Sequence, residues 1–294
     1  MEIQDKAKFA NILYLTDFSP CSEAALPFAA RWARESGAKL HVVHVLTPES
    51  YVYTEPSLMG VACKAAEDHA RAVVQRIDSG LKDLQHEARV ERAVGVWPFV
   101  EQAIESDDVD LVVVGTRGRT GAKKLLLGSV AEEIFRRSTV PVLTIGPKVQ
   151  SHASLQCVLY ATDLSPESLV GAPYALYLAR QNRARLVLLL VLGKPKTLRE
   201  GDAHLSDTFE RQAIDHLLRI FPLNSKLEPP PEVVVEYGEP AERIVGVAQE
   251  RSVDLIVLGI RDAEGRIGAA THLDNAVAHK VVVTAQCPVL TVRN

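Results

Sequence analysis

The chain has 294 residues, which corresponds to about two domains at roughly 150 residues each, although a single large α/β barrel can also have this length. Hydrophobic residues make up 47% and charged residues 24% of the sequence, values that exclude a disordered or collagen-like chain. The formal net charge of −4 argues against a surface that attracts polyanions throughout, so we predict neither nucleic acid nor a membrane as a partner.

The N-terminus and the cysteine spacing favour a reducing cytoplasmic location. Residues 1–6 include acidic side chains where a secretory signal needs a basic segment followed by an apolar one. The longest apolar runs, such as 186–192, are far shorter than the ~18 residues that cross a bilayer. The four cysteines are too far apart in the sequence to form a C-x-x-C pair.

In chain order, the first half predicts strands that alternate with helices. Ser19 is expected to cap a helix with Pro20 at its first position and Gly37 at its end, because these residue types favour those positions. Further helices are predicted at 62–85, 99–106 and 129–137, and strands at 11–16, 39–46, 88–94, 111–114 and 140–145. A polar loop is expected over 47–60. Unbroken apolar strands between helices indicate an α/β fold with a parallel sheet covered on both faces.

Segments of the first half return in the second half in the same order. Ile12-Leu-Tyr-Leu-Thr-Asp17 returns as Val158-Leu-Tyr-Ala-Thr-Asp163, at an offset of 163 − 17 = 146 residues. The run ending in Gly115 returns as the run ending in Gly259, at an offset of 259 − 115 = 144, and the segment 141–145 returns at 288–292, at an offset of 147. This period is too long for a solenoid repeat. We therefore predict two tandem domains, 1–147 and 155–294, with the join in 147–154.

Two loops of the first half are expected to hold a ligand, because open parallel sheets bind ligands beyond the carboxyl ends of their strands. One loop contains Thr16 and Asp17; the other runs from Gly115 to a helix start at Gly128-Ser129. Glycines permit turns that other residues avoid and close approach of a ligand, and helix N-termini attract anions. Nearby positive charges come from Arg117, Arg119, Lys123 and Lys124. The pattern predicts a phosphate site, although its spacing matches neither a P-loop nor a dinucleotide fingerprint.

The string Gly115-x2-Gly118-x9-Gly128-Ser129, with Thr16-Asp17 and Pro141-Val-Leu, resembles the universal stress protein family, and the resemblance extends over nearly the whole chain. It implies two Rossmann-like domains of the adenine nucleotide alpha hydrolase type, each with a five-stranded parallel sheet in the order 3-2-1-4-5. It also implies a stress-response regulator that binds ATP, with or without Mg²⁺.

Carried over position by position, the resemblance places Asp17 at the adenosine, the backbone of Val45 at the adenine, and Gly128 at the phosphates. The complete set of implied ATP-binding residues is Thr16, Asp17, Val45, Gly115, Arg117, Gly118, Gly128, Ser129 and Val130.

The second half departs from this pattern at its ligand loop. It keeps Asp163 and Gly259, but Asp262 stands where the family has its second glycine, and His272-Leu273 stands where it has Gly-Ser. A carboxylate repels a phosphate, and the loss of glycine hinders close backbone approach. We therefore predict that the second domain does not bind ATP in the same way.

Simpler roles remain open for individual residues. Ser129 with Glu132 can form a capping box, and Asp17 can merely stabilise its turn. His41 and His44 point to opposite faces of one strand, so we interpret them as surface histidines or histidines with hydrogen-bond partners, and we predict no metal site. No catalytic residue is predicted, because no nucleophile motif is present.

Three functional hypotheses follow. The first is ATP-dependent regulation by a protein that is not an enzyme; the second is slow ATP hydrolysis or phosphoryl transfer. The third is a nucleotide-independent interaction scaffold, with partner specificity in the loops 51–60 and 194–206. Family resemblance and unprotected edges further predict an intramolecular pseudo-dimer through strands 141–145 and 288–292, and a homodimer of two chains.

Overall fold

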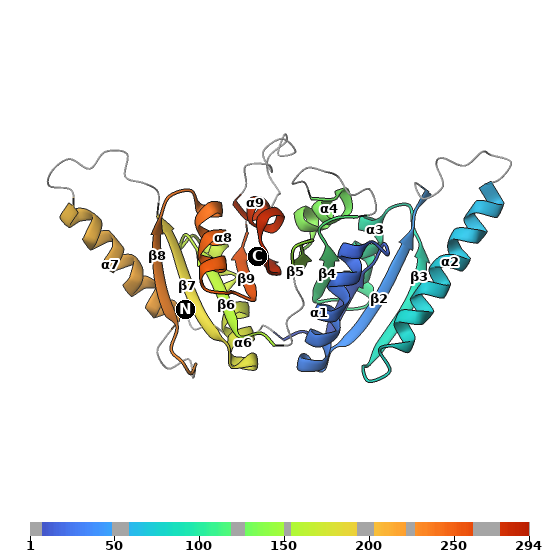
Figure 1. Cartoon of the computed structure of the whole chain (residues 1–294), viewed down its shortest axis with the longest axis horizontal. Helices are drawn as coiled ribbons and strands as arrows, with labels where there is room; N and C mark the ends of the chain where they lie inside the picture. Colours follow the sequence, from blue (N-terminus) through green and yellow to red (C-terminus); the bar gives the residue numbers. More distant parts are fainter. Residues whose placement is uncertain are drawn as a thin grey trace. The chain divides into compact units, whose positions relative to one another are not determined.

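We analysed a computed structural model of the chain, which describes residues 8–48, 59–118, 127–149, 154–192, 203–221, 227–260 and 277–293. The chain divides into two compact units, Phe9–Ser151 and His152–Asn294. Each unit contributes five parallel strands with helices packed against them (Figure 1). The predicted fold class is confirmed.

In the first unit the strand order is β3-β2-β1-β4-β5, and every neighbouring pair is parallel. Helix α1 packs against β1, β4 and β5, α2 packs against β2 and β3, and α3 contacts α4. The elements are β1 (Asn11–Leu15), α1 (Pro20–Ser36), β2 (Lys39–Leu46), α2 (Met59–Ser79), β3 (His86–Arg92), α3 (Val96–Ser106), β4 (Leu111–Gly115), α4 (Ser129–Arg137) and β5 (Val142–Ile145).

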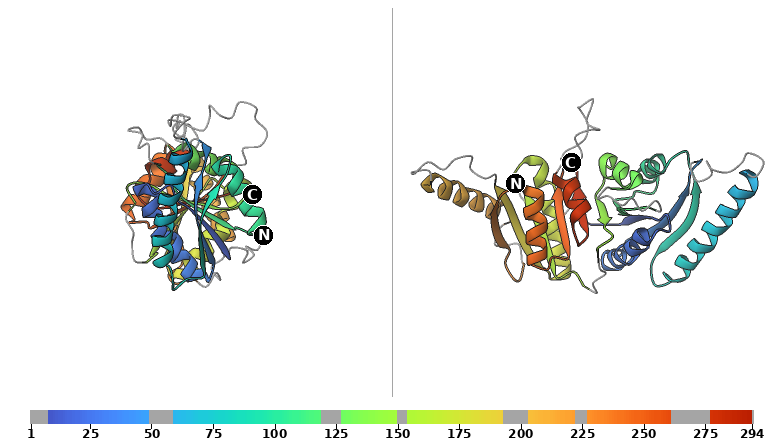
Figure 2. Two further views of the ribbon diagram at one scale, coloured as in Figure 1. Left: turned by 90° about the vertical axis from the view of Figure 1, so that its right-hand side faces the viewer. Right: turned by 45° about the horizontal axis from the view of Figure 1, so that its top comes forward.

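The second unit repeats this topology as β8-β7-β6-β9-β10, again with parallel neighbours. Both units therefore have the expected 3-2-1-4-5 order. Figure 2 shows the helices of each unit beside its strands. The elements are β6 (Cys157–Thr162), α5 (Pro166–Leu169), α6 (Ala172–Asn182), β7 (Arg185–Leu192), α7 (Ala203–Ile220), β8 (Glu232–Tyr237), α8 (Pro240–Glu250), β9 (Leu255–Gly259), α9 (Val277–Thr284) and β10 (Val289–Val292).

Central strands form the core of each unit. All five residues of β4 and all six of β6 are buried, as expected for strands covered on both faces. The edge strand β3 alternates charged and apolar residues, and most of it is half-buried. Within the described ranges, no helix combines the length and apolarity needed to cross a membrane.

Several predicted boundaries are wrong. Helix α2 spans Met59–Ser79 rather than 62–85, and β3 begins at His86 rather than at residue 88. Helix α3 begins at Val96 with Gly95 as its N-cap, so Pro98 lies inside the first turn. Proline is tolerated there because the first N–H groups of a helix have no intrahelical acceptor. The capping of α1 by Ser19 and its end at Gly37, with φ of 71°, agree with the prediction.

Candidate functional site

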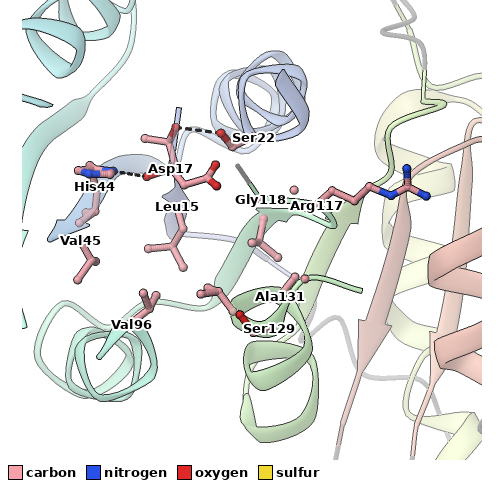
Figure 3. A pocket seen from close by; sticks show the side chains of 16 residues that line it. Leu15, Asp17, Ser22, His44, Val45, Val96, Arg117, Gly118, Ser129 and Ala131 are labelled. Atoms are coloured by element: carbon pink, nitrogen blue, oxygen red, sulfur yellow. Dashed lines mark hydrogen bonds between the residues drawn. The ribbon is translucent and has the colours of Figure 1, made fainter. Parts of the chain in front are cut away.

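A pocket of about 240 Å³ lies at the carboxyl ends of β1, β2 and β4 in the first unit. Its lining includes every residue that the resemblance implied, and Figure 3 shows how several of them face a common space. The lining residues are Leu15, Thr16, Asp17, Ser22, Val43, His44, Val45, Val96, Val114, Gly115, Arg117, Gly118, Gly128, Ser129, Val130 and Ala131.

The turn between β1 and α1 holds Asp17 in a defined position. Asp17 Oδ1 accepts hydrogen bonds from the Ser19 backbone N–H at 3.0 Å and from the Ser19 hydroxyl at 2.6 Å. Phe18, between them, has a φ of 62°, which is strained for a bulky residue. Asp17 thus stabilises its turn, as the simpler interpretation holds, and its side chain also lines the pocket.

Close polar contacts connect the three pocket segments. The Ser19 hydroxyl lies 3.1 Å from the Arg117 carbonyl oxygen, which links the first loop to the residues after β4. The Gly128 N–H donates to the Thr116 carbonyl at 2.8 Å, which brings the start of α4 to the same place. The two loops therefore lie together, as predicted, and these contacts connect the turn after β1, the residues after β4 and the start of α4 into one frame.

The glycines in this frame provide space rather than unusual torsion angles. Neither Gly115 nor Gly118 has a φ in the left-handed region, so the expectation of turns that other residues avoid is wrong for both. A Cβ on Gly115 would lie 2.8 Å from the backbone of Cys21 and Ser22 in α1. A Cβ on Gly118 would lie 2.9 Å from Asp17 Oδ2. Gly115 therefore permits close packing of a helix, whereas Gly118 leaves room beside the Asp17 carboxylate.

The start of α4 forms the anion-attracting side of the pocket. Gly128 is the N-cap and Ser129 is the first helical residue, so the capping box in which Ser129 would be the cap is not formed. The first N–H groups of this helix have no intrahelical acceptor, and the helix dipole adds positive potential. The Arg117 guanidinium, in contrast, points away from Leu15 and Asp17 (Figure 3). Arg119, Lys123 and Lys124 lie outside the described residues.

The pocket also has an apolar wall, of which sequence reasoning predicted Val45 and missed the other residues. The wall consists of Leu15, Val43, Val45, Val96 and Val114. Val96 follows the turn after β3, so the rule about carboxyl strand ends could have indicated it. The register Leu15↔Val43 fixes β2 beside β1 and places Val45 beyond the end of β1 at the pocket.

Two buried histidines on β2 behave differently. His44 lines the pocket, its Nδ1 lies 2.7 Å from the Thr16 carbonyl oxygen, and its ring stacks on Phe18 at 4.2 Å. Because a carbonyl only accepts, Nδ1 carries the proton. His41 is 3% exposed, and neither of its ring nitrogens makes a hydrogen bond to the residues that the structure describes, contrary to the prediction. Two carboxylates lie 3.9 and 4.0 Å from its Nδ1. Burial lowers the pKa of His41.

No group of three or more His, Cys, Asp or Glu side chains comes together as a metal site among the residues that the structure describes. Asp262, His272 and Leu273 of the second unit lie outside those residues. Val277 and Ala278 line the second unit's pocket where Val130 and Ala131 line the first, at an offset of 277 − 130 = 147. At that offset Asn275-Ala276, rather than His272-Leu273, correspond to Gly128-Ser129.

Comparison with known proteins agrees with the duplicated fold. The family model for the universal stress protein family matches residues 8–146 and again 155–293. A universal stress protein of Mycolicibacterium smegmatis is 28% identical over 294 residues, which cover 96% of this chain and 97% of that protein. A Bacillus subtilis universal stress protein is 33% identical over 150 residues, or 47% of this chain and 99% of its own.

Among solved structures, a universal stress protein of Archaeoglobus fulgidus is similar, with a TM-score of 0.69 and 21% identity over 96% of this chain and 98% of that one. This likeness concerns the fold. With both halves matched by the same family model, the chain belongs to the universal stress protein family as a tandem pair of its domains.

Proposed function

We propose that the first unit binds ATP in the pocket at the carboxyl ends of β1, β2 and β4, and that the bound state acts as a regulatory signal in the stress response. The observation that supports this most directly is the convergence of all the implied ATP-binding residues on one pocket. In this proposal the domain 1–147 holds the nucleotide site, and the domain 155–294 does not bind ATP in the same way.

The chemistry of the pocket suits a nucleotide from one end to the other. Valine and leucine side chains form a wall against which an uncharged ring can pack. The Asp17 carboxylate, beside that wall, can accept hydrogen bonds from hydroxyl groups. The N-terminus of α4 also lines the pocket and favours a negatively charged group. An uncharged ring, hydroxyl groups and phosphates are the parts of ATP.

Hydrolysis remains the lower-ranked alternative. Asp17 is the one carboxylate among the pocket residues that the structure describes, and its Oδ1 already accepts two hydrogen bonds from Ser19. An Mg²⁺ ion that accompanied ATP would therefore be held mainly by the phosphates and water. We expect ATP to stay intact during prolonged incubation with Mg²⁺, as measured by chromatography against a Gly118→Asp control; faster turnover by the unchanged chain would favour the enzymatic hypothesis.

Calorimetric titration of the full chain with ATP tests the binding proposal. Gly118→Asp places a second carboxylate beside Asp17 and reproduces the residue found at the equivalent position 262, so ATP affinity should fall by about tenfold or more. Gly246→Ala in α8 is the matched control, because a Cβ there meets nothing within 4 Å. Absence of binding at millimolar ATP, or equal affinity of the Gly118→Asp variant, would contradict the proposal.

The regulatory part needs a separate measurement. If the bound state is a signal, ATP should change the pattern of limited proteolysis of the unchanged chain and leave that of Gly118→Asp unaltered. The pairing of strands 141–145 and 288–292, the homodimer, the scaffold hypothesis and the cytoplasmic location stay predictions.

A further inference from the structure

The first strand of each unit pairs with its neighbour over a different length. In the second unit the pairing of β6 with β7 extends to Thr162↔Leu190. The equivalent pair in the first unit, at an offset of 146, is Thr16 with His44. That pair is absent, because the pairing of β1 with β2 ends one position earlier. The sheet of the first unit therefore opens one residue earlier, at the edge of the first pocket.

The difference amounts to one backbone hydrogen bond. In a parallel ladder, a carbonyl accepts from the N–H group of the residue that follows its pairing partner. The Thr16 N–H donates to the Val43 carbonyl at 3.0 Å, so the two strands still lie side by side at this level. The companion bond, from the Val45 N–H to the Thr16 carbonyl, is absent among the described residues. The pairing at Thr162 in the second unit includes the equivalent bond, from the Val191 N–H.

The Val45 N–H points toward the pocket. Alternate residues of β2 direct their backbone groups to β1 and to β3, because the Lys39 N–H donates to the Ala10 carbonyl and the Leu46 carbonyl accepts from the Ala93 N–H. Val45 lies an even number of residues after Lys39, so its backbone faces the side of β1. Since β1 has ended at that level and Val45 lines the pocket, its N–H is directed into the space where a ligand would lie.

The His44 side chain binds the Thr16 carbonyl instead. Its Nδ1 donates to that oxygen at 2.7 Å (Figure 3), and its buried ring stacks on Phe18 with the ring centroids 4.2 Å apart. At the equivalent positions the second unit has Leu190 and Leu164, whose side chains neither donate a hydrogen bond nor stack. The turn itself does not account for the difference, because φ is 62° at Phe18 and 64° at Leu164. The ring-to-carbonyl bond and the shorter ladder thus occur in the same unit.

We propose that His44 is a positioning residue of the nucleotide site, which holds the Thr16 carbonyl and thereby leaves the Val45 N–H for the ring of the ligand. The inference rests on the proposed function, because it assigns this N–H to the adenine ring of ATP. A backbone N–H beside an apolar wall needs an acceptor, and an uncharged ring that packs on the wall supplies one through a ring nitrogen. The second unit uses the equivalent N–H within its own sheet.

Hydrogen exchange of single backbone amides, followed by NMR in the full chain without ligand, tests the first step. After correction for intrinsic rates, Val45 should exchange about tenfold or more faster than Val191, because an N–H outside the ladder is less protected. His44→Leu reproduces the residue of the second unit and should slow the exchange of Val45 to the rate of Val191. His44→Asn should leave it fast, because asparagine keeps an N–H donor at the same number of bonds from the backbone as Nδ1.

Calorimetry with ATP analogues tests the second step. In 1-deaza-, 3-deaza- and 7-deaza-ATP, one ring nitrogen of adenine is replaced by C–H. One of these analogues should bind about tenfold more weakly than ATP to the unchanged chain and to His44→Asn. His44→Leu should bind ATP as weakly as that analogue, because its Val45 N–H is already paired. His41→Leu makes the same change on the same strand outside the pocket lining and is the matched control, expected to behave as the unchanged chain does.

The possible failures are distinguishable. Equal exchange of Val45 and Val191 in the unchanged chain overturns the inference, and this comparison needs no variant. ATP binding without a weaker analogue, or a preference for ATP that persists in His44→Leu, also overturns it and leaves the proposed function standing. If the unchanged chain binds no ATP while His44→Leu slows the exchange of Val45, the proposed function is refuted and the role of His44 at the end of the ladder is confirmed. Circular dichroism verifies that each variant is folded.

Discussion

Replacement of Gly115 by alanine separates a packing role from a ligand-binding role at the end of β4. The added Cβ would lie 2.8 Å from the Cys21 carbonyl carbon and the Ser22 backbone nitrogen, and 2.9 Å from the Cys21 oxygen. These atoms belong to the backbone of α1 and cannot rotate away, so the helix must shift. Overpacking of this kind costs about 1–3 kcal/mol, and we expect that loss in the free energy of unfolding without any nucleotide.

The assay can report the first unit alone. The chain has two tryptophans, Trp32 and Trp97, and both are buried in the first unit, so urea unfolding followed by tryptophan fluorescence isolates that unit. Gly246→Ala supplies a control of opposite sign, because alanine is favoured over an interior helical glycine by about 0.5–1 kcal/mol and the added Cβ meets nothing within 4 Å. That gain should appear in unfolding of the whole chain followed by circular dichroism, and not in the tryptophan fluorescence, which reports the first unit. An unchanged or higher fluorescence midpoint for Gly115→Ala would refute the packing argument.

Three further outcomes are expected. Gly118→Ala should lower the free energy of unfolding by less than about 1 kcal/mol, because the added Cβ meets the end of the flexible Asp17 side chain. The same variant should bind ATP more weakly in calorimetry, and an unchanged affinity would show that ATP does not use the space beside Asp17. Since burial lowers the pKa of His41 in the folded chain, the unfolded chain binds more protons below the ordinary value of 6.5, and the first unit should lose stability as the pH falls below that value. Tryptophan-detected unfolding at several pH values should show a shallower loss for His41→Leu, and an identical slope would contradict this assignment. Asp254→Ala should destabilise the second unit by about 1–2 kcal/mol, because the Asp254 carboxylate accepts hydrogen bonds from the backbone N–H groups of Gln156 at 2.8 Å and Cys157 at 2.9 Å. Thermal melting can be followed by circular dichroism, and an unchanged melting temperature would argue against the importance of these hydrogen bonds.

The sequence was sufficient to predict much of the fold because the buried strands are unmistakably apolar. The bounds 39–46 and 129–137 coincide with β2 and α4, where an apolar run or a marked amphipathic pattern ends abruptly. The predicted range of β3 lies two residues too late in the chain, because the charged residues of this strand obscure its apolar pattern. Its start is set by pairing with β2, through Leu40↔His86, and such pairing leaves no local signal.

The candidate site was predictable on its glycine-rich side, whereas on its apolar side only Val45 was predicted. The spacing from Gly115 to Ser129 is unusual enough to suggest a phosphate site, whereas Val43 and Val114 look like any core valines until the sheet is assembled. The role of Gly115 differs from the predicted one, because its distance to α1 depends on tertiary packing. The sequence predicts that His41 is solvated or has a hydrogen-bond partner, and only the folded chain shows that its ring nitrogens make no hydrogen bond to the described residues.

The close approach of α1 to the end of β4 has a consequence for how the two copies can diverge. In the second unit a Cβ on Gly259 would lie 2.3 Å from the Ser168 carbonyl oxygen, so the same strand end is held against the same helix turn. Replacement of either glycine would push the helix away from the end of the strand, whereas the residues that follow the glycines can change without affecting that contact. Evolution can therefore alter ligand preference in one copy by rewriting a loop on an unchanged frame, and a protein engineer could transplant the loop of one unit into the other between the same fixed ends.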